Sequence, residues 1–312
     1  MRVIILTNVR ENHWFDGNDK LYIHLPLDFN MAANLGYLGR NKNECMFDIE
    51  NNVITRVVHS GVANRLVEMY LNDNNQMIVQ FIDSTPDEKE LKKVFSFIWE
   101  WFDLDRDLSP FYRMAKEDPL LEKPAQEFRG LRVIGVTDLF EALCWGVLGQ
   151  QINLAFAYTL KKQFVERFGE SIEFNGKKYW TFPTYKQIAK LTPEDLADIK
   201  MTVRKSEYII GIAKLMDSGE LSKEKLLAMD FKDAEKSLIK IRGIGPWTAN
   251  YVLMRCLRFP TAFPIDDVGL HNAIKFLRGS EKKPSKEELM ELSLNWSGWQ
   301  AYATFYLWRV LY

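Results

Sequence analysis

Two features that could do chemistry lie close together in the second half of the chain. Gly243 and Gly245 stand one residue apart between apolar runs, and Pro246 follows them at the start of a helical pattern. Glycine permits positive φ angles and close backbone approach, and proline suits the first turn of a helix. Such a hairpin turns backbone N–H groups outward, where they can bind a phosphate. Two adjacent carboxylates, Asp266 and Asp267, then begin the next helical run.

These residues resemble a known family. The segments GIGPWTAN and FPIDDVGL are similar to the helix-hairpin-helix and Gly/Pro-Asp region of base-excision DNA glycosylases, above all the AlkA-type 3-methyladenine DNA glycosylases. Taken alone, Gly-Ile-Gly is equally compatible with an ordinary turn between two helices. The resemblance extends over residues 100–312 and implies an enzyme that removes damaged bases from double-stranded DNA as a monomer.

The resemblance gives the carboxylates a role. Cleavage of an N-glycosidic bond builds positive charge on the sugar, which a buried carboxylate can stabilise while it orients or deprotonates a water molecule. Comparison with AlkA-type sequences places this carboxylate at Asp267, whereas comparison with the oxidised-guanine branch favours Asp266. We predict Asp267, because the Val-Gly-Leu that follows resembles the alkylation branch, and expect Asp266 to cap the helix. Two capping acids without a catalytic role are the alternative.

Three aromatic residues are candidates for a base-binding pocket. Lyases of this superfamily carry a lysine two positions after the hairpin glycines; here Trp247 stands there and cannot form a Schiff base, so a monofunctional hydrolase is expected. Tyr251 lies one turn further along the same helical face. In WSGWQAYATFYLW, Trp308 matches the family's pocket-stacking tryptophan. Aromatic rings favour cationic bases such as 3-methyladenine and 7-methylguanine; core packing is the alternative role.

The resemblance also implies contacts to the DNA duplex. A side chain must fill the gap that an extruded nucleotide leaves. We expect Gln151 to be this wedge, with Gln150 and Asn153 contacting the orphaned base or the bend, although AlkA-type enzymes carry an apolar wedge. A helix junction whose amides cap backbone groups is the alternative. The predicted phosphate contacts come from Arg242, Gly243, Gly245 and Thr248.

Charge is unevenly distributed along the chain. The net charge is −1, but residues 1–88 hold seven Lys/Arg against twelve Asp/Glu, and the remaining residues hold 34 against 30. Local excess of basic residues suits phosphate contact. The sequence therefore predicts a basic face around the hairpin, formed by Lys240, Arg242, Arg255, Arg258, Lys275 and Arg278.

The pattern of the whole chain predicts an α+β protein with two domains. Residues 1–86 contain β-rich segments separated by Asn/Asp/Gly turns, with Asn51-Asn52 as a hairpin turn and one helix-like run over 63–71. They resemble the N-terminal antiparallel sheet domain of AlkA-type enzymes. Residues 87–312 are expected to form an all-α glycosylase region, with a possible hairpin over 171–183 and the helix-hairpin-helix over about 231–257.

Several classes of protein and site are disfavoured. The three cysteines are widely spaced, which excludes the four-cysteine cluster of endonuclease III-type relatives and predicts no metal site. We expect no cofactor, apart from a monovalent or divalent cation that the hairpin backbone could hold. No apolar run is long enough to span a membrane or to act as a secretory signal, so a cytoplasmic location is expected. The rival functions are an 8-oxoguanine DNA glycosylase and a non-catalytic DNA-binding module.

Overall fold

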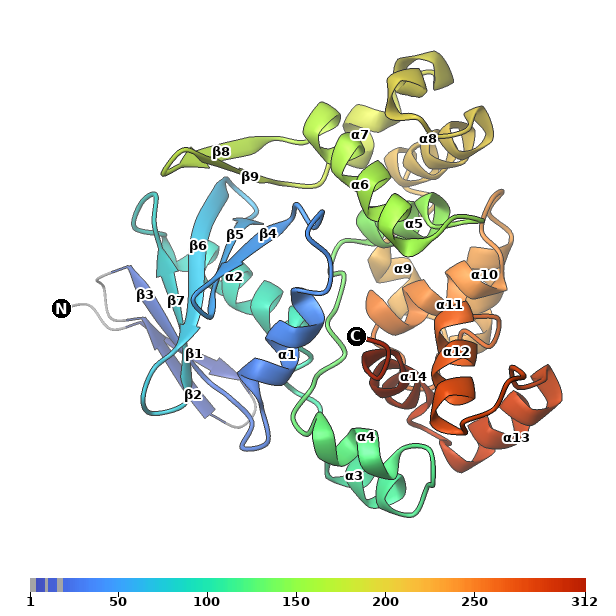
Figure 1. Cartoon of the computed structure of the whole chain (residues 1–312). Helices are drawn as coiled ribbons and strands as arrows, with labels where there is room; N and C mark the ends of the chain where they lie inside the picture. The colour runs from blue at the N-terminus through green and yellow to red at the C-terminus, as the bar shows by residue number, and fades with distance from the viewer. Residues whose placement is uncertain (1–3, 9–10, 16–18) are drawn as a thin grey trace.

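The first part of the chain forms an antiparallel sheet. The computed structural model describes residues 4–8, 11–15 and 19–312. In the described residues the strand order of the larger sheet is β1-β2-β3-β7-β6-β5-β4, with every neighbouring pair antiparallel (Figure 1). Its strands are β1 (Ile4–Asn8), β2 (Glu11–Phe15), β3 (Lys20–His24), β4 (Phe47–Glu50), β5 (Val53–His59), β6 (Asn64–Leu71) and β7 (Gln76–Phe81).

Two local predictions in the sheet have opposite outcomes. Asn51 and Asn52 both have positive φ, 51° and 64°, and connect β4 to β5, as their types predict. The helix expected over 63–71 is wrong, because this segment is strand β6 and pairs with both β5 and β7. Hydrogen bonding on both edges and burial of Leu66 and Val67 outweigh its weak helical preference. The helix of this region is instead α1 (Met31–Leu38).

Helix α1 joins the sheet to the helical region. Asn34 lies inside α1 and is fully buried. Its amide donates to the Gly130 carbonyl at 3.0 Å and accepts from the Arg132 backbone N–H at 3.0 Å. Gly130 has a φ of 87°, and a Cβ there would lie 2.0 Å from the Asp28 carbonyl oxygen. Figure 1 shows α1 on the side of the sheet that faces the helical core.

The rest of the chain is mostly helical, as predicted. Asp87 caps α2 with a reciprocal bond to Glu90, so the helix begins two residues after the expected boundary at 86. The helices are α2 (Glu88–Trp101), α3 (Ser109–Lys116), α4 (Glu122–Glu127), α5 (Leu139–Leu148), α6 (Leu154–Phe168), α7 (Tyr185–Ile188), the 3-10 helix η1 (Pro193–Ile199), α8 (Val203–Asp217), α9 (Lys223–Leu227), α10 (Phe231–Ile239), α11 (Pro246–Arg255), α12 (Val268–Leu277), α13 (Lys286–Asn295) and α14 (Gln300–Arg309).

The region 87–312 is mostly but not entirely α-helical, because the hairpin predicted over 171–183 is present. Strands β8 (Ser171–Phe174) and β9 (Lys177–Trp180) form a hairpin that extends over the N-terminal sheet (Figure 1). Tyr179 packs with Val57 and Leu66 of that sheet in a small apolar cluster. Lys177 forms ion pairs with Asp48 at 2.8 Å and Glu50 at 3.1 Å. These contacts show that the β8–β9 hairpin packs against the N-terminal sheet and not against the helices.

The core is continuous and centres on α11 and α14. Residues 248–255 of α11 and 301–308 of α14 are all buried, so neither helix has a solvated side over these stretches. Helix α11 packs against α5 and α10, and α14 packs against α12. Buried helices hold their side chains in fixed rotamers. The side chains of α11 and α14 in these buried stretches therefore have fixed positions. No helix in the described part of the chain is long and apolar enough to cross a membrane.

Candidate active site

Asp267 is a buried carboxylate at the start of α12. It is the N-cap residue of this helix and is 8% exposed. Its Oδ1 accepts hydrogen bonds from the Leu270 backbone N–H and from the Trp308 indole N–H, both at 2.7 Å. Its Oδ2 accepts from the Trp247 indole N–H at 2.8 Å. Three donors, each on a rigid group, therefore fix the orientation of the carboxylate.

Asp266 has a different environment. Its side chain is 40% exposed and forms an ion pair with Lys286 at 2.5 Å. The prediction that Asp266 caps α12 is wrong, because the cap is Asp267. A cap must immediately precede the first helical residue, Val268, with an extended backbone, and Asp267 has φ −72° and ψ 120°. The buried member of the pair is thus the one predicted to be catalytic.

Gly269 is a site residue that the sequence analysis did not identify. A Cβ at this position would lie 2.9 Å from the Asp267 Oδ1 and 3.2 Å from the Trp308 ring. Glycine costs about 1 kcal/mol relative to alanine inside a helix. Its position in the first turn of α12 is explained by the close approach of the indole to the carboxylate. The unfavourable residue type was the only signal available in the sequence.

The three predicted pocket aromatics are brought together around Asp267. Trp247 and Tyr251 lie one turn apart on α11 and stack, with ring centroids 5.6 Å apart and planes at 24°. Trp308 approaches from α14. Trp247 is half-buried, while Tyr251 and Trp308 are buried. Burial raises the pKa of Tyr251 to about 12, so its hydroxyl is neutral at physiological pH. The Arg255 guanidinium lies 5.4 Å from the Tyr251 ring centroid.

The glycine hairpin leaves the N-terminus of α11 open. Gly243 has a φ of 93°, and a Cβ there would lie 2.3 Å from the Tyr208 ring, so both conformation and space require glycine. Gly245 is the N-cap of α11, has an ordinary φ of −93°, and has open space where a Cβ would be. No side chain caps α11. Its first backbone N–H groups therefore lack a side-chain acceptor and can receive a phosphate.

The predicted side-chain contacts to phosphate are only partly supported by the geometry. Arg242 is 75% exposed and forms an ion pair with Glu207 at 2.8 Å. The Thr248 side chain is buried, and its methyl group would lie 2.3 Å from a Cβ on Gly146 of α5, so this side chain does not contact a phosphate. Only the backbone N–H of Thr248 belongs to the exposed helix end. Every residue of α11 from 248 to 255 is buried, so this side chain lies in the core.

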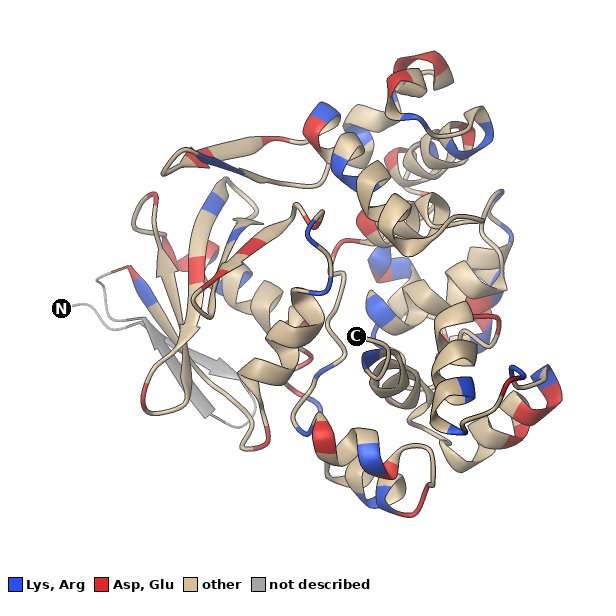
Figure 2. Cartoon of the chain, in the orientation of Figure 1, with Lys and Arg blue, Asp and Glu red and all other residues tan. Residues whose placement is uncertain are grey.

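The predicted basic face is narrower than the sequence suggests. Arg255 is 4% exposed and donates to the Tyr37 hydroxyl at 2.7 Å. Arg258 is bound to Asp103 and Asp105. Figure 2 shows Lys and Arg along the loop that joins α10 to α11. The basic charge next to the hairpin thus comes from that loop and not from the C-terminal end of α11.

The turn between α5 and α6 is attached to the hairpin. The Gln150 side-chain amide donates to the Gly243 carbonyl at 2.8 Å, and Asn153 caps α6 by accepting from the Phe156 N–H at 2.9 Å. These are the bonds that the alternative, a helix junction, predicts for both residues. Gln151 is exposed and has a positive φ of 58°. Of the three, Gln151 has the geometry that suits a protruding wedge.

Lys205 of α8 binds the end of α5 that leads into this turn. It is buried and donates to the Leu148 carbonyl at the C-terminal end of α5, at 2.7 Å. Burial lowers its pKa. Its cationic end therefore satisfies the C-terminus of α5. This contact could not be predicted from the sequence, because Leu148 lies far from Lys205 along the chain.

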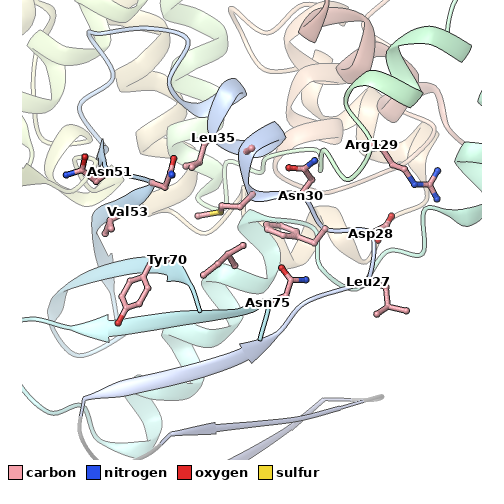
Figure 3. A pocket seen from close by; sticks show the side chains of 14 residues that line it. Leu27, Asp28, Asn30, Leu35, Asn51, Val53, Tyr70, Asn75 and Arg129 are labelled. Carbon is pink, nitrogen blue, oxygen red and sulfur yellow. The ribbon is translucent and has the colours of Figure 1, made fainter. Parts of the chain in front are cut away.

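Two cavities adjoin α1, and Asp267 itself lines neither of them. An open pocket of about 880 Å³ lies beside α1 and the N-terminal sheet (Figure 3), where Tyr70, Asn75 and Arg129 line it. None of the residues around Asp267 contributes to it. A smaller cavity of about 50 Å³ has Tyr251 and Arg255 on one wall and residues of α1 on another. Among the described residues, no three His, Cys, Asp or Glu side chains are grouped as a metal site.

Comparisons with known proteins identify the family of the chain. Residues 144–298 match the model of the HhH-GPD superfamily of base excision DNA repair proteins, and residues 27–143 match that of the 8-oxoguanine DNA glycosylase N-terminal domain. The chain is 69% identical to a DNA-3-methyladenine glycosylase of Bacillus subtilis over 96% of its own length and 99% of that protein. It is 28% identical to DNA-3-methyladenine glycosylase 2 of Escherichia coli, over 57% and 60%.

Solved structures share the fold. A 3-methyladenine DNA-glycosylase from Archaeoglobus fulgidus matches with a TM-score of 0.80 and 25% identity, over 93% of this chain and 96% of that one. The 8-oxoguanine glycosylase/lyase of Clostridium acetobutylicum, in complex with double-stranded DNA, matches with a TM-score of 0.75 and 19% identity, over 99% and 97%. The similarity thus covers the N-terminal sheet as well as the helical region.

Proposed function

Because the chain belongs to the HhH-GPD superfamily of base excision DNA repair proteins and is a DNA glycosylase, we propose that it hydrolyses the N-glycosidic bond of alkylated purines in duplex DNA. The substrates are of the 3-methyladenine and 7-methylguanine type. The observation that carries the proposal is the carboxylate of Asp267, held by two indole N–H groups beside stacked aromatic rings.

Asp267 is the proposed catalytic carboxylate. As the bond to the base breaks, the sugar acquires oxocarbenium character, and a fixed negative charge lowers the energy of that state. The same carboxylate can accept a proton from the attacking water. Within the described part of the chain Asp267 forms no ion pair with Lys, Arg or His; its partners are neutral N–H groups. Its charge is therefore not neutralised before the substrate binds.

Trp247 supports a monofunctional reaction. It occupies the position at which lyases of the superfamily carry a nucleophilic lysine, and its indole N–H is already bound to Asp267. An indole forms no imine with the sugar, so water is the nucleophile and the product is an intact abasic site. Tyr251 and Trp308 would contact the extruded base, whose alkylation makes it a better leaving group. This reaction needs no cofactor.

The hairpin is proposed to anchor the strand that carries the damaged base. The uncapped N–H groups at the start of α11 would bind a phosphate, and Gln151 would fill the space left by the extruded nucleotide. The Gly243 carbonyl accepts from Gln150, so this bond would hold wedge and anchor at a constant separation. A cation held by other hairpin carbonyls, bridging to the phosphate, is compatible with this arrangement.

The second candidate function is removal of 8-oxoguanine, which the match of residues 27–143 favours. The test uses duplexes that carry one 7-methylguanine, 3-methyladenine, hypoxanthine or 8-oxoguanine. Each is incubated with the protein and analysed with and without alkali. We expect release of the alkylated purines, strand breaks only after alkali, and no adduct with borohydride. A trapped adduct, or faster release of 8-oxoguanine than of 7-methylguanine, would support the second function instead.

A further inference from the structure

The small cavity beside Tyr251 is built by both parts of the chain. Tyr251 and Arg255 come from α11. Tyr37 lies in α1, and Arg40 directly follows Gly39, the C-cap residue of α1. The Arg255 guanidinium donates to the Tyr37 hydroxyl at 2.7 Å, which holds the two walls together. At about 50 Å³ the cavity has room for a few water molecules or for one edge of a planar ring.

The cavity is rich in hydrogen-bond donors. Its charged lining residues are Arg40, Glu44, Arg56, Glu141, Lys161 and Arg255. Both carboxylates bind Lys161, Glu141 at 3.0 Å and Glu44 at 3.4 Å. The three guanidinium groups form no ion pairs within 4.0 Å in the residues the structure describes, so donors exceed acceptors around this space.

Arg40 is the guanidinium group best placed to act on a ligand. It lies 3.8 Å from the Tyr37 ring centroid and 5.6 Å from that of Tyr158, and one of its N–H groups donates to the Tyr37 carbonyl at 2.8 Å. Arg56, in contrast, is buried with its Nε unpartnered and lies 4.6 Å from the Trp101 ring centroid. Aromatic faces hold Arg40 in one plane while its remaining N–H groups keep their donor capacity.

We infer that Arg40 is a specificity-determining residue that donates to a carbonyl oxygen at C6 of the extruded purine, so that the enzyme favours 6-oxopurines over 6-aminopurines. This rests on the proposed function, since Tyr251 is taken as part of the base pocket. 7-Methylguanine and hypoxanthine present an O6 acceptor; 3-methyladenine presents an amine, whose N–H groups would face other donors. A donor opposite a donor leaves both without a partner.

The contacts that the Tyr251 ring already makes support this inference. Arg255 lies 5.4 Å from the Tyr251 ring centroid, and Trp247 stacks against the same ring, so much of the Tyr251 surface is already in contact. A cationic base gains less from this ring than an open aromatic face would provide. Hydrogen bonding to O6 therefore contributes to selection in addition to the positive charge of the base, and uncharged hypoxanthine belongs to the substrate class.

The experiment measures relative release of two bases from the same DNA. Methylated DNA contains 7-methylguanine and 3-methyladenine, and single-turnover release of each is followed by chromatography, with a hypoxanthine duplex assayed in parallel. For Arg40→Gln we expect release of 7-methylguanine and hypoxanthine to fall about 10- to 100-fold, with 3-methyladenine changed less than about twofold. Because both methylated bases are in one sample, a reduced fraction of folded enzyme lowers both rates equally and leaves their ratio unchanged.

Two further variants make the result specific. Arg40→Lys keeps the positive charge but loses the planar fork, and should give an intermediate ratio. Arg129→Gln is the matched control, because Arg129 also lies over a tyrosine ring, Tyr112 at 4.2 Å, but outside this cavity. Its ratio should equal that of the wild type. An equal fall for both bases in Arg40→Gln, or no fall, overturns the inference. A wild type that releases neither base overturns the proposed function itself.

Discussion

Asp267 and Glu90 are both buried carboxylates at the start of a helix, but their partners differ. Asp267, 8% exposed, receives three neutral N–H donors, two of them from Trp247 and Trp308. Glu90, 3% exposed, receives two N–H groups of Arg65 at 2.9 and 2.8 Å, the Ser60 hydroxyl at 2.9 Å and the Asp87 N–H at 3.0 Å.

Glu90 has a cationic partner and Asp267 has none, and this difference distinguishes a structural carboxylate from one suited to catalysis. At the junction of sheet and α2 the negative charge of Glu90 is balanced by Arg65, and these hydrogen bonds lower the pKa of Glu90 to about 2. Around Asp267 the protein supplies orientation but no balancing cation. A positive charge that develops on a substrate can therefore complete this site. Each of the following substitutions alters one side of this comparison.

The largest expected effect is that of Asp267→Asn. Loss of the negative charge removes stabilisation of the cationic transition state, so single-turnover base release should fall by about a thousandfold or more. Binding to damaged duplex should persist or tighten, because repulsion between the carboxylate and phosphates is removed. Asp266→Asn, which breaks only an exposed ion pair with Lys286, is the matched control and should retain activity. An inactive Asp266→Asn beside an active Asp267→Asn would place catalysis one residue earlier.

Trp308→Phe should have the next largest effect. The ring is kept, but the N–H that donates to Asp267 Oδ1 at 2.7 Å is lost. A hydrogen bond to a charged acceptor contributes about 1.5 to 3 kcal/mol, so the rate of 7-methylguanine release should fall about 10- to 100-fold. Trp308→Ala also removes the stacking surface and should lose release of this base. If Trp308→Phe has wild-type rates while Trp308→Ala is inactive, the indole serves only as a packing surface.

Glu90→Gln should affect stability and not the chemical step. Folding lowers the pKa of Glu90, so its ionisation stabilises the fold above an unfolded pKa of about 4.3, and this contribution is lost as pH falls towards 2. We expect Glu90→Gln to lower the free energy of unfolding by about 2 kcal/mol at pH 7, with the difference from wild type shrinking below about pH 4. Denaturant titrations at several pH values measure this. A changed rate per folded molecule would contradict the assignment.

The parts of this molecule that could be predicted are those specified by neighbouring residues. The hairpin follows from Gly243 and Pro246, and the start of α12 from the acidic pair, because turns and caps depend on a few adjacent side chains. Segment 63–71 was misassigned because its strand state depends on pairing with β5 and β7. The burial of the Thr248 side chain could not be foreseen, because it depends on contact with α5. The cavity around Arg40 also lay beyond sequence reasoning, since its walls come from distant segments.

The smallest expected effect concerns the hairpin, which contributes binding and no chemistry. Gly245→Asp introduces a negative charge at the uncapped N-terminus of α11 without strain, since φ is −93° and no atom lies within 4 Å of the new Cβ. The carboxylate would bind the first N–H groups in place of a phosphate, so affinity for all duplexes should fall about tenfold, with a weaker dependence on salt. Fluorescence anisotropy with undamaged, abasic and lesion-containing duplexes measures this. Gly211→Asp on α8, also in open space, controls for the added charge. Loss of affinity for one lesion alone would instead assign the hairpin a part in reading the base.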